Sequence, residues 1–461
     1  MIITAIDIGS TWTKGAAFQL DANETLRLLA REARPTTVHN LAEGFFQVRD
    51  ALDQQAGSGT LVYSSSAKGG LAVAALGLVP DITSEMAKIA AYSAGARLSQ
   101  VYSYRLTRAD ILALEQNPPD ILLFAGGTDG GNADYLLANA DALARSSLDC
   151  PIVYAGNRSV RDELAERLQG RDVRFVDNLL PEIGRPNPEP ARAALRDLFL
   201  DRIVTGKGLD RIVAATGVEP VPTPYAVYEF ARLLKAHQPD WDEFMLIDLG
   251  GATTDVYSCH AEQPVAGTVH RGLPEPPLKR TVEGDLGMRV SAGAAAVSGR
   301  ALIDEGLGRA PERLDAFAGH VERISANPGM LPDDATSQQF DAVLAGACLA
   351  EACSRHAGRM HEVSTVDGLV NVQTGRDLRG VKRIIGSGGY LASEPQFDPN
   401  PWLQRVRLDE RSHQILAPQS VQYYRDEHYL VPLLANAARH CPEAAAHAAG
   451  VLLQPVTHQA S

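Results

Sequence analysis

The sequence is poor in the features that mark several specialised classes of protein. Its 461 residues include five cysteines, an odd number at wide spacing, which argues against a disulfide framework and fits a reducing compartment. No run of residues approaches the ~18 apolar positions that a membrane-spanning helix needs. The first residues carry no basic segment and reach an acidic residue at Asp7, so a secretory signal is not expected. These absences predict a cytoplasmic protein.

Basic residues are also in deficit. The chain has 43 Lys and Arg against 56 Asp and Glu, which gives a formal net charge of −13. Because there is no long basic run either, general binding to nucleic acid or to an anionic membrane is not expected. Hydrophobic residues at 45% and charged residues at 21% are typical of a globular protein. At roughly 150 residues per domain, the length predicts about three domain-sized units.

The order of apolar segments predicts an α/β protein built in parts. Short strands at 2–8, 15–20 and 27–34 indicate an antiparallel meander, and a similar strand–turn–strand pattern returns at 243–258. Between them, apolar strands alternate with helices of about 10–15 residues, which is typical of βαβ units and a parallel sheet. We therefore predict a doubly wound α/β module at about 98–185, inserted into a larger fold. Further helices are expected at 40–52, 221–235, 340–357 and 426–453.

Three glycine-rich segments carry the chemistry: DIGSTWTK at 7–14, DLGGATTD at 248–255 and IGSGGY at 385–390. In the first two, a buried strand ends near an aspartate with glycine two residues later, and this glycine lets backbone N–H groups approach phosphate oxygens. A carboxylate beside a polyphosphate is repulsive unless Mg²⁺ lies between them. Two such loops could hold a triphosphate from both sides, and the third would let a flat base lie against bare backbone. The alternative is that the first two are ordinary tight hairpin turns and the third is a turn that enters a helix.

The order of these segments resembles the actin/Hsp70/sugar-kinase ATPase superfamily. The resemblance rests on DIGST with a following Lys, VPTPYAV at 221–227, DLGGATTD, IIGSGG and an Ala-rich C-terminal helix. VPTPYAVYEFARLL and YLVPLLANAA (429–438) stand where those proteins carry the helices that connect their lobes. The resemblance implies a two-lobed actin-like (ribonuclease H-like) ATPase fold. Its first lobe would span 1–240 with the inserted module, its second lobe 241–420, and C-terminal helices at 421–461 would return to the first lobe.

A closer resemblance covers nearly the whole chain. AGGTDGGN (125–132), YAGNRSV (154–160) and RGLPEPPLKRTVEGDLGMR (271–289), together with the glycine-rich segments, are similar to the glutamate mutase accessory family known as MutL or GlmL. The resemblance implies an ATP-dependent chaperone that reactivates an adenosylcobalamin-dependent aminomutase and uses ATP hydrolysis to release damaged cobalamin. The implied cofactors are ATP/ADP and Mg²⁺. The implied partner is the mutase itself, contacted through its cobalamin-binding subunit.

Within this resemblance, single residues take roles. Asp7 and Asp248 would hold Mg²⁺ through water, and Asp255 is a candidate to orient or deprotonate the attacking water, so these three are the expected catalytic residues. Lys14 either contacts phosphate or is an exposed lysine on the second strand. The expected nucleotide-binding residues are Gly9, Ser10, Thr11, Thr13, Lys14, Gly250, Gly251, Thr253, Thr254, Gly386, Ser387, Gly388 and Gly389.

The inserted module suggests how a partner is recognised. Its α/β pattern is similar in kind to the module that binds cobalamin in such mutases, which gives the hypothesis that 98–185 docks on, or displaces, the cobalamin-binding subunit. The module lacks the D-x-H-x-x-G pattern, so it is not expected to bind cobalamin itself. Its deletion is expected to abolish mutase binding and to spare ATP binding. Asp129, in AGGTDGG, has no role that the sequence assigns.

Other interpretations stay open at this stage. A small-molecule kinase of the same superfamily would use the same loops, with the module as a substrate lid, and an inactive scaffold would need neither Asp-Gly loop. Cys348 and Cys353 lie on one predicted helix, but their spacing favours buried residues over a metal site. Glu283 and Asp285 either reach the site or form a solvated turn. Trp12 either covers the nucleotide or packs in the core.

Overall fold

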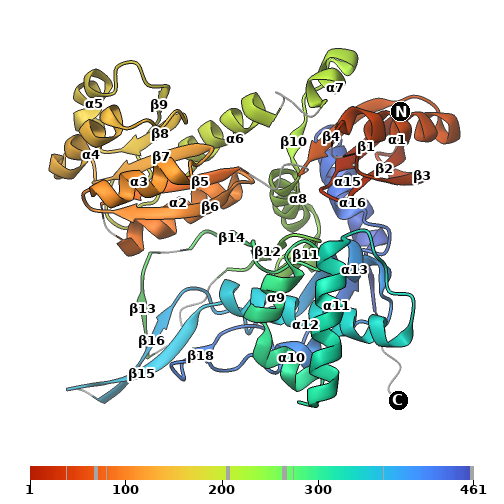
Figure 1. Cartoon of the computed structure of the whole chain (residues 1–461). Helices are drawn as coiled ribbons and strands as arrows, with labels where there is room; N and C mark the ends of the chain where they lie inside the picture. The colour runs from red at the N-terminus through yellow and green to blue at the C-terminus, as the bar shows by residue number, and fades with distance from the viewer. Residues whose placement is uncertain are drawn as a thin grey trace.

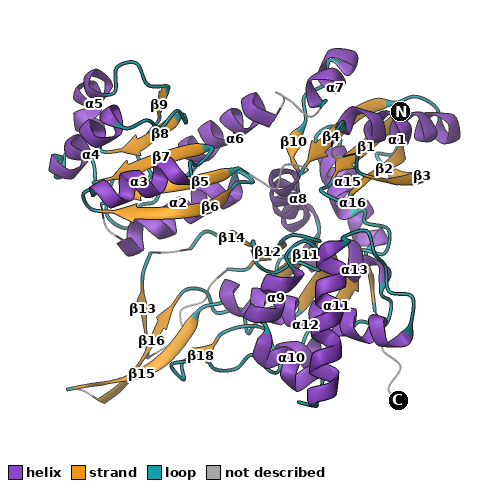
Figure 2. Cartoon of the chain, viewed as in Figure 1, coloured by secondary structure: helices purple, strands orange, loops and turns teal. Residues whose placement is uncertain are grey.

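The computed structural model describes residues 1–37, 39–66, 71–78, 80–203, 208–261, 267–273, 275–366 and 368–456. Three bodies of mixed helix and strand make up the chain: one at the N-terminus, one in the C-terminal half, and one formed by residues between them (Figures 1 and 2). Each contains a β-sheet of its own. No helix in this described part is long and apolar enough to cross a membrane.

The first lobe is built on a five-stranded sheet in the order β10-β4-β1-β2-β3. Its strands are β1 (Ile2–Ile8), β2 (Trp12–Leu20), β3 (Leu26–Pro35), β4 (Thr60–Ser65) and β10 (Val221–Pro222). β1, β2 and β3 pair antiparallel, and β4 and β10 are added in parallel on the other side of β1. α1 (Leu41–Ala56) packs on the sheet with its buried stripe of Phe45, Val48 and Leu52. The predicted meander and the helix that follows it are confirmed.

The second lobe repeats this arrangement and adds one strand. Its six-stranded sheet has the order β14-β12-β11-β17-β19-β20. The strands are β11 (Phe244–Leu249), β12 (Thr254–Cys259), β14 (Leu278–Glu283), β17 (Arg383–Ser387), β19 (Gln422–Arg425) and β20 (Gln454–Pro455). Counted within each sheet, both lobes have the strand order 3-2-1-4-5 with the first three strands antiparallel. The chain therefore has the two-lobed actin-like fold that the motifs predict.

Helices between the lobes join the two sheets. α8 (Thr223–His237), α15 (Val431–Ala437) and α16 (Pro442–Leu452) contribute to one hydrophobic core that also takes Ile3 and Phe18 from the first sheet and Leu246 and Ile385 from the second. α8 and α16 contact each other, and the alanines that they contribute to this core leave room for a close approach. The predicted C-terminal segment 421–461 begins with β19, which stays in the second sheet, and the helices that return to the first sheet begin at α15.

The inserted module carries a parallel sheet in the order β6-β5-β7-β8-β9. Its elements are β5 (Ala72–Gly77), α2 (Pro80–Ser93), β6 (Arg97–Ser103), α3 (Arg108–Gln116), β7 (Ile121–Gly126), α4 (Asp134–Arg145), β8 (Ile152–Gly156), α5 (Arg161–Arg167), β9 (Val173–Phe175) and α6 (Glu189–Ile203). Counted within the sheet, the order 2-1-3-4-5 is a common doubly wound arrangement. β5 lies inside this sheet, so the sheet begins before the predicted start at 98. β5 is absent from the predicted elements because AVAALG is short and rich in alanine, a poor strand former.

A smaller sheet projects from the second lobe in the order β13-β16-β15-β18 (Figure 1). Its strands are β13 (Thr268–Arg271), β15 (Arg359–Thr365), β16 (Gly368–Thr374) and β18 (Gln414–Ile415). The helices not yet named are α7 (Leu209–Thr216), α9 (Ala292–Ser298), α10 (Arg300–Gly306), α11 (Pro311–Ala326), α12 (Ala335–His356), α13 (Gly389–Ser393) and α14 (Asn400–Leu403). α12 confirms the helix expected at 340–357, whereas the small sheet was not predicted.

Candidate functional site

A pocket of about 660 Å³ lies between the lobes, within the size range of ligand sites. Both lobes line it, and so does the turn at the start of β6 in the inserted module. Of the sequence-predicted residues, the pocket is lined by Gly9, Ser10, Thr11, Lys14, Asp248, Gly250, Gly251, Thr253, Asp255, Gly388 and Gly389. Asp7, Thr13, Thr254, Gly386 and Ser387 are predicted site residues that do not line it.

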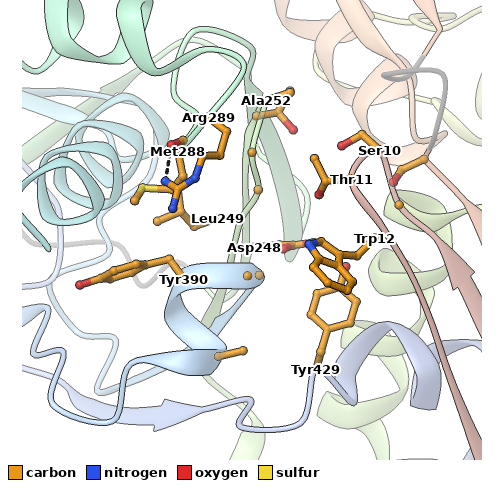
Figure 3. A pocket seen from close by; sticks show the side chains of 18 of the residues that line it. Ser10, Thr11, Trp12, Asp248, Leu249, Ala252, Met288, Arg289, Tyr390 and Tyr429 are labelled. Carbon is orange, nitrogen blue, oxygen red and sulfur yellow. Dashed lines mark hydrogen bonds between the residues drawn. The ribbon is translucent and has the colours of Figure 1, made fainter. Parts of the chain in front are cut away.

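The two Asp-Gly loops form the same turn and face each other. The Gly9 N–H donates to the Trp12 carbonyl at 3.0 Å, and the Gly250 N–H donates to the Thr253 carbonyl at 2.9 Å. A Cβ at Gly9 would lie 2.7 Å from that Trp12 oxygen, so only glycine fits the first turn. A Cβ at Gly251 would lie 3.6 Å from the Thr11 side chain, which measures how closely the loops approach. Figure 3 shows Ser10 and Thr11 opposite Asp248 and Ala252.

Asp7 lies beneath the first loop, outside the pocket. Its carboxylate accepts hydrogen bonds from Thr223 Oγ1 at 2.5 Å, Ser64 Oγ at 2.9 Å and Tyr429 Oη at 3.3 Å. Burial raises the pKa of Asp7, and these hydroxyls oppose the rise. Because both oxygens already have donors, Asp7 in this geometry joins β1, β4 and α8.

Asp248 is the carboxylate that the pocket leaves available. It lines the floor of the pocket, and among the described residues no hydrogen bond or ion pair ends on its oxygens. Burial, together with the negative charge of Asp255, raises the pKa of Asp248 to about 7. A pocket carboxylate without donors suits a cation, and Mg²⁺ is commonly held by one or two carboxylates, phosphate oxygens and water. The described residues contain no cluster of three or more His, Cys, Asp or Glu side chains that would hold a metal directly.

Asp255 lies on β12 opposite Asp248 in the strand pairing, and it too lines the pocket. Its Oδ1 accepts from Arg280 Nε at 2.9 Å and also from Arg280 Nη2. Its Oδ2 is 3.5 Å from the Thr253 hydroxyl. Oδ1 is thus committed to Arg280, whereas the bond that Oδ2 accepts from Thr253 is long.

Lys14 lies between carboxylates from three parts of the chain. Its Nζ is 3.1 Å from the centroid of the Tyr429 ring, and it lines the pocket. Burial lowers the pKa of Lys14, whereas the charges of Asp7, Asp248 and Asp426 oppose that change. Lys14 is therefore the counter-charge of this acidic floor, and the alternative that it is an exposed lysine is wrong.

The third glycine-rich loop divides into two halves. Gly388 and Gly389 line the pocket, but Gly386 and Ser387 pack behind it. A Cβ at Gly386 would lie 2.0 Å from the Tyr423 hydroxyl, and Ser387 Oγ donates to Asp426 at 2.7 Å. The first half of this motif therefore serves packing.

Gly388 offers a stability test with a neighbouring control. Its φ is +94°, and a Cβ there would lie 2.2 Å from the Leu249 carbonyl oxygen. We expect Gly388→Ala to lower the free energy of unfolding by about 3 kcal/mol or more, because strain and overpacking add. Gly389→Ala meets nothing within 4 Å, and we expect its effect to stay within about 0.5 kcal/mol. Urea unfolding without nucleotide measures both, and equal effects would contradict the packing argument.

Several pocket residues were not predicted as site residues. Arg289 donates to Asp341 Oδ2 at 2.7 Å and to the Met288 carbonyl at 2.7 Å, and Figure 3 shows it above Tyr390 on the same side of the pocket. Asp341 also contacts His320 Nε2 at 2.9 Å. Arg289 is the last residue of TVEGDLGMR, a segment of the family resemblance, so the sequence could have indicated it as a site residue. No sequence pattern near Asp341, on α12, indicates a site residue. Trp12 lines the pocket and is 41% exposed, which excludes simple core packing.

The other candidates lie outside the pocket. Asp129 accepts hydrogen bonds from the Arg158 N–H and from Asn178 Nδ2, both at 3.0 Å, and so ties together loops at the end of the module's sheet. Glu283 and Asp285 both pair with Arg355, so neither reaches the pocket nor forms a free turn. The helix residues Cys348, Cys353 and His356 are buried.

The chain is similar over nearly its full length to one protein family. It matches the family described as MutL protein over residues 3–450. It is 36% identical to Protein MutL of Clostridium tetanomorphum over 454 residues, which cover 95% of this chain and 96% of that protein. Among solved structures, nucleotide-free acetone carboxylase aligns with 95% of this chain and 70% of its own, at 12% identity and a TM-score of 0.41. A glycerol dehydratase reactivase aligns with 95% of this chain and 100% of its own, at 10% identity and a TM-score of 0.31.

Proposed function

The chain belongs to the MutL protein family, and from that premise we propose that it is an ATPase that reactivates an adenosylcobalamin-dependent mutase. One observation carries the ATPase part of the proposal. Two identical turns, Gly9–Trp12 and Gly250–Thr253, face each other across a pocket whose floor holds the Asp248 carboxylate. Neither turn alone distinguishes a phosphate site from a hairpin, whereas their opposition across one pocket supports a polyphosphate ligand.

In this proposal, different residues of the pocket bind the phosphates, hold Mg²⁺ and orient the attacking water. Backbone N–H groups and hydroxyls of the two loops bind the phosphates, with Ser10, Thr11 and Thr253 as hydroxyl donors. Asp248 holds Mg²⁺ through water, with Asp7 supporting the loop from beneath. Mg²⁺, when bound with the nucleotide, neutralises phosphate charge and polarises the transferred phosphoryl group. Asp255 orients the attacking water through Oδ2.

The base side of the pocket suits a purine. Gly388 and Gly389 present bare backbone, while Arg289 and Tyr390 present flat side chains (Figure 3). Arg289 is held by Asp341 and the Met288 carbonyl, so its guanidinium has a defined place. A planar guanidinium stacks well on an aromatic ring. We place the base between these groups.

Reactivation requires that nucleotide state change the protein's shape. The pocket is lined from both lobes, so a bound triphosphate contacts both, and ATP and ADP would favour different arrangements of the lobes. We propose that one arrangement binds the mutase, of the glutamate mutase type, and loosens its damaged cobalamin. The inserted module is the proposed contact to the cobalamin-binding subunit.

The module cannot be tested by simple deletion. Deletion of 98–185 would remove the strands β6 and β7 that pair with β5, and it would begin directly after Gly95, Ala96 and Arg97, which line the pocket, so it would disturb the pocket as well as the module. A better variant carries Tyr104→Ser and Tyr135→Ser. These side chains are 53% and 40% exposed, contact each other and do not line the pocket. Weaker mutase binding with unchanged ATP turnover would support docking through the module.

The deciding experiment measures ATP turnover and mutase activity together. Purified protein is incubated with Mg²⁺ and ATP, with and without an adenosylcobalamin-dependent aminomutase inactivated by turnover. Hydrolysis by the protein alone, and return of mutase activity only with ATP, are the expected results. ATP consumption that requires an added metabolite, with no recovery of the mutase, would replace the proposal with the kinase alternative.

A further inference from the structure

Arg280, on β14 of the second lobe, is buried and uses three nitrogens for two different tasks. Nε and Nη2 donate to Asp255 Oδ1, at 2.9 Å in the case of Nε. Nη1 donates to the Tyr92 carbonyl and, at 3.4 Å, to the Ala96 carbonyl. The guanidinium is planar and rigid, so the two sets of bonds move together. One side chain thus joins the candidate catalytic carboxylate to the inserted module.

The acceptors at Tyr92 and Ala96 bracket the end of α2. The last carbonyls of a helix lack partners within the helix and carry partial negative charge, so a buried cation is stabilised there. α2 ends in a turn at Gly95, whose φ is +87°. The module therefore offers Arg280 the part of α2 that most favours a positive charge.

The same turn is packed tightly against the start of α8. A Cβ at Gly95 would lie 2.9 Å from Pro222 Cβ and 3.3 Å from the Tyr225 nitrogen. Gly95, Ala96 and Arg97 also line the nucleotide pocket. A displacement of this turn toward α8 meets Pro222 and Tyr225 directly, so movement of the turn is restricted on that side.

We infer that Arg280 is a positioning residue that couples Asp255 to the C-terminal turn of α2, so that a change of nucleotide at Asp255 shifts the inserted module. The inference rests on the proposed function, since it needs ATP to bind in this pocket. It assigns the direction of the signal: from the phosphate end of the pocket, through β12 and β14, into α2. Asp255 Oδ2 contacts the hydrolytic water, and Oδ1 carries the change to Arg280.

The test compares Arg280→Gln with wild type by hydrogen exchange of segment 85–103 and by steady-state ATP hydrolysis. In wild type, exchange of this segment should differ between ATP and ADP. Because Arg280 itself lines the pocket, both proteins are compared at saturating nucleotide. In Arg280→Gln, that difference should vanish, and kcat should fall about 10- to 100-fold because Asp255 is misplaced. Arg355→Gln is the matched control, since it removes an arginine of the same lobe whose hydrogen bonds and ion pairs, among the described residues, go to Glu283, Asp285 and Glu351 and none to α2.

Each outcome decides one proposal. If wild type hydrolyses ATP but segment 85–103 exchanges equally in ATP and ADP, the coupling is overturned and the ATPase stands. If Arg280→Gln keeps the nucleotide-dependent difference, the coupling runs elsewhere and the inference is wrong. If wild type neither binds nor hydrolyses ATP, the proposed function fails. Should Arg280→Gln not fold, Arg280→Lys keeps the charge without the planar fork, and a reduced exchange difference is expected.

Discussion

Asp248→Asn is expected to remove Mg²⁺-dependent ATP hydrolysis, with a loss in kcat of about 100-fold or more. Removing one group that stabilises the charge developing in the transition state typically lowers kcat by a factor of about 10²–10³. Asp248 is the pocket carboxylate with no protein donor on its oxygens among the described residues, so an amide there offers no charge for Mg²⁺. Steady-state hydrolysis over a range of Mg²⁺ concentrations measures the loss. Asp242→Asn, an exposed position on the same lobe, is the matched control.

The same variant should fold, which separates chemistry from stability. Folding raises the pKa of Asp248 from its ordinary value of 3.8 to about 7. As the pH rises above 3.8, ionisation of Asp248 therefore lowers the free energy of unfolding of the wild type. Asparagine does not ionise and escapes this cost. Without nucleotide, the free energy of unfolding of Asp248→Asn relative to that of wild type should therefore rise between about pH 4 and pH 8. A variant that is inactive because it unfolds more easily at pH 8 would contradict this account.

Lys14→Met is expected to destabilise the nucleotide-free protein strongly. It leaves the buried carboxylates Asp7, Asp248 and Asp426 without their shared cation. Removing one partner of a buried ion pair costs about 3–5 kcal/mol, and Lys14 keeps some exposure, so we expect about 3 kcal/mol. Urea unfolding at pH 8 measures the loss, and exposed Lys382→Met is the control.

The effect of Lys14→Met should shrink when Mg²⁺ and ATP are added. A second cation near Asp248 replaces part of the lost positive charge, and any ligand that binds the folded state stabilises it by mass action. The stabilisation of Lys14→Met by Mg²⁺-ATP should therefore be larger than that of wild type. Equal stability of Lys14→Met and wild type without nucleotide would show that Lys14 is not the counter-charge.

The sequence predicts those parts of the site that are made locally. A strand, an aspartate and a glycine turn are adjacent in the chain, so the loops at Asp7 and Asp248 could be recognised from their order alone. That the two loops lie opposite each other across one pocket could also be predicted from the sequence, because the strand pattern repeats and implies two similar lobes. The same reasoning predicts two lobes, a parallel module and connecting helices, all of which are local patterns of apolar spacing.

Residues whose partners are distant in sequence could not be assigned. Gly386 and Gly388 share one motif, yet Gly386 makes room for Tyr423 and Gly388 for the Leu249 carbonyl. No local pattern in the sequence assigns a role to Arg280, because its partners Asp255 and the end of α2 are distant in the chain. Asp7 and Asp248 look equivalent in sequence. They differ because Ser64, Thr223 and Tyr429 supply donors to the first alone.

The shared core of α8, α15 and α16 has a mechanical consequence. Because one packed cluster takes side chains from both sheets, the lobes cannot separate without opening that core, so it acts as a pivot. The module touches the machinery near this pivot through the end of α2, and Figure 1 shows α4 and α5 at the side of the module away from α8. A rigid body turning about one end moves most at the other. If the module turns as one body about this pivot, it would act as a lever arm, and a small rotation at the pocket would give a larger displacement at α4 and α5.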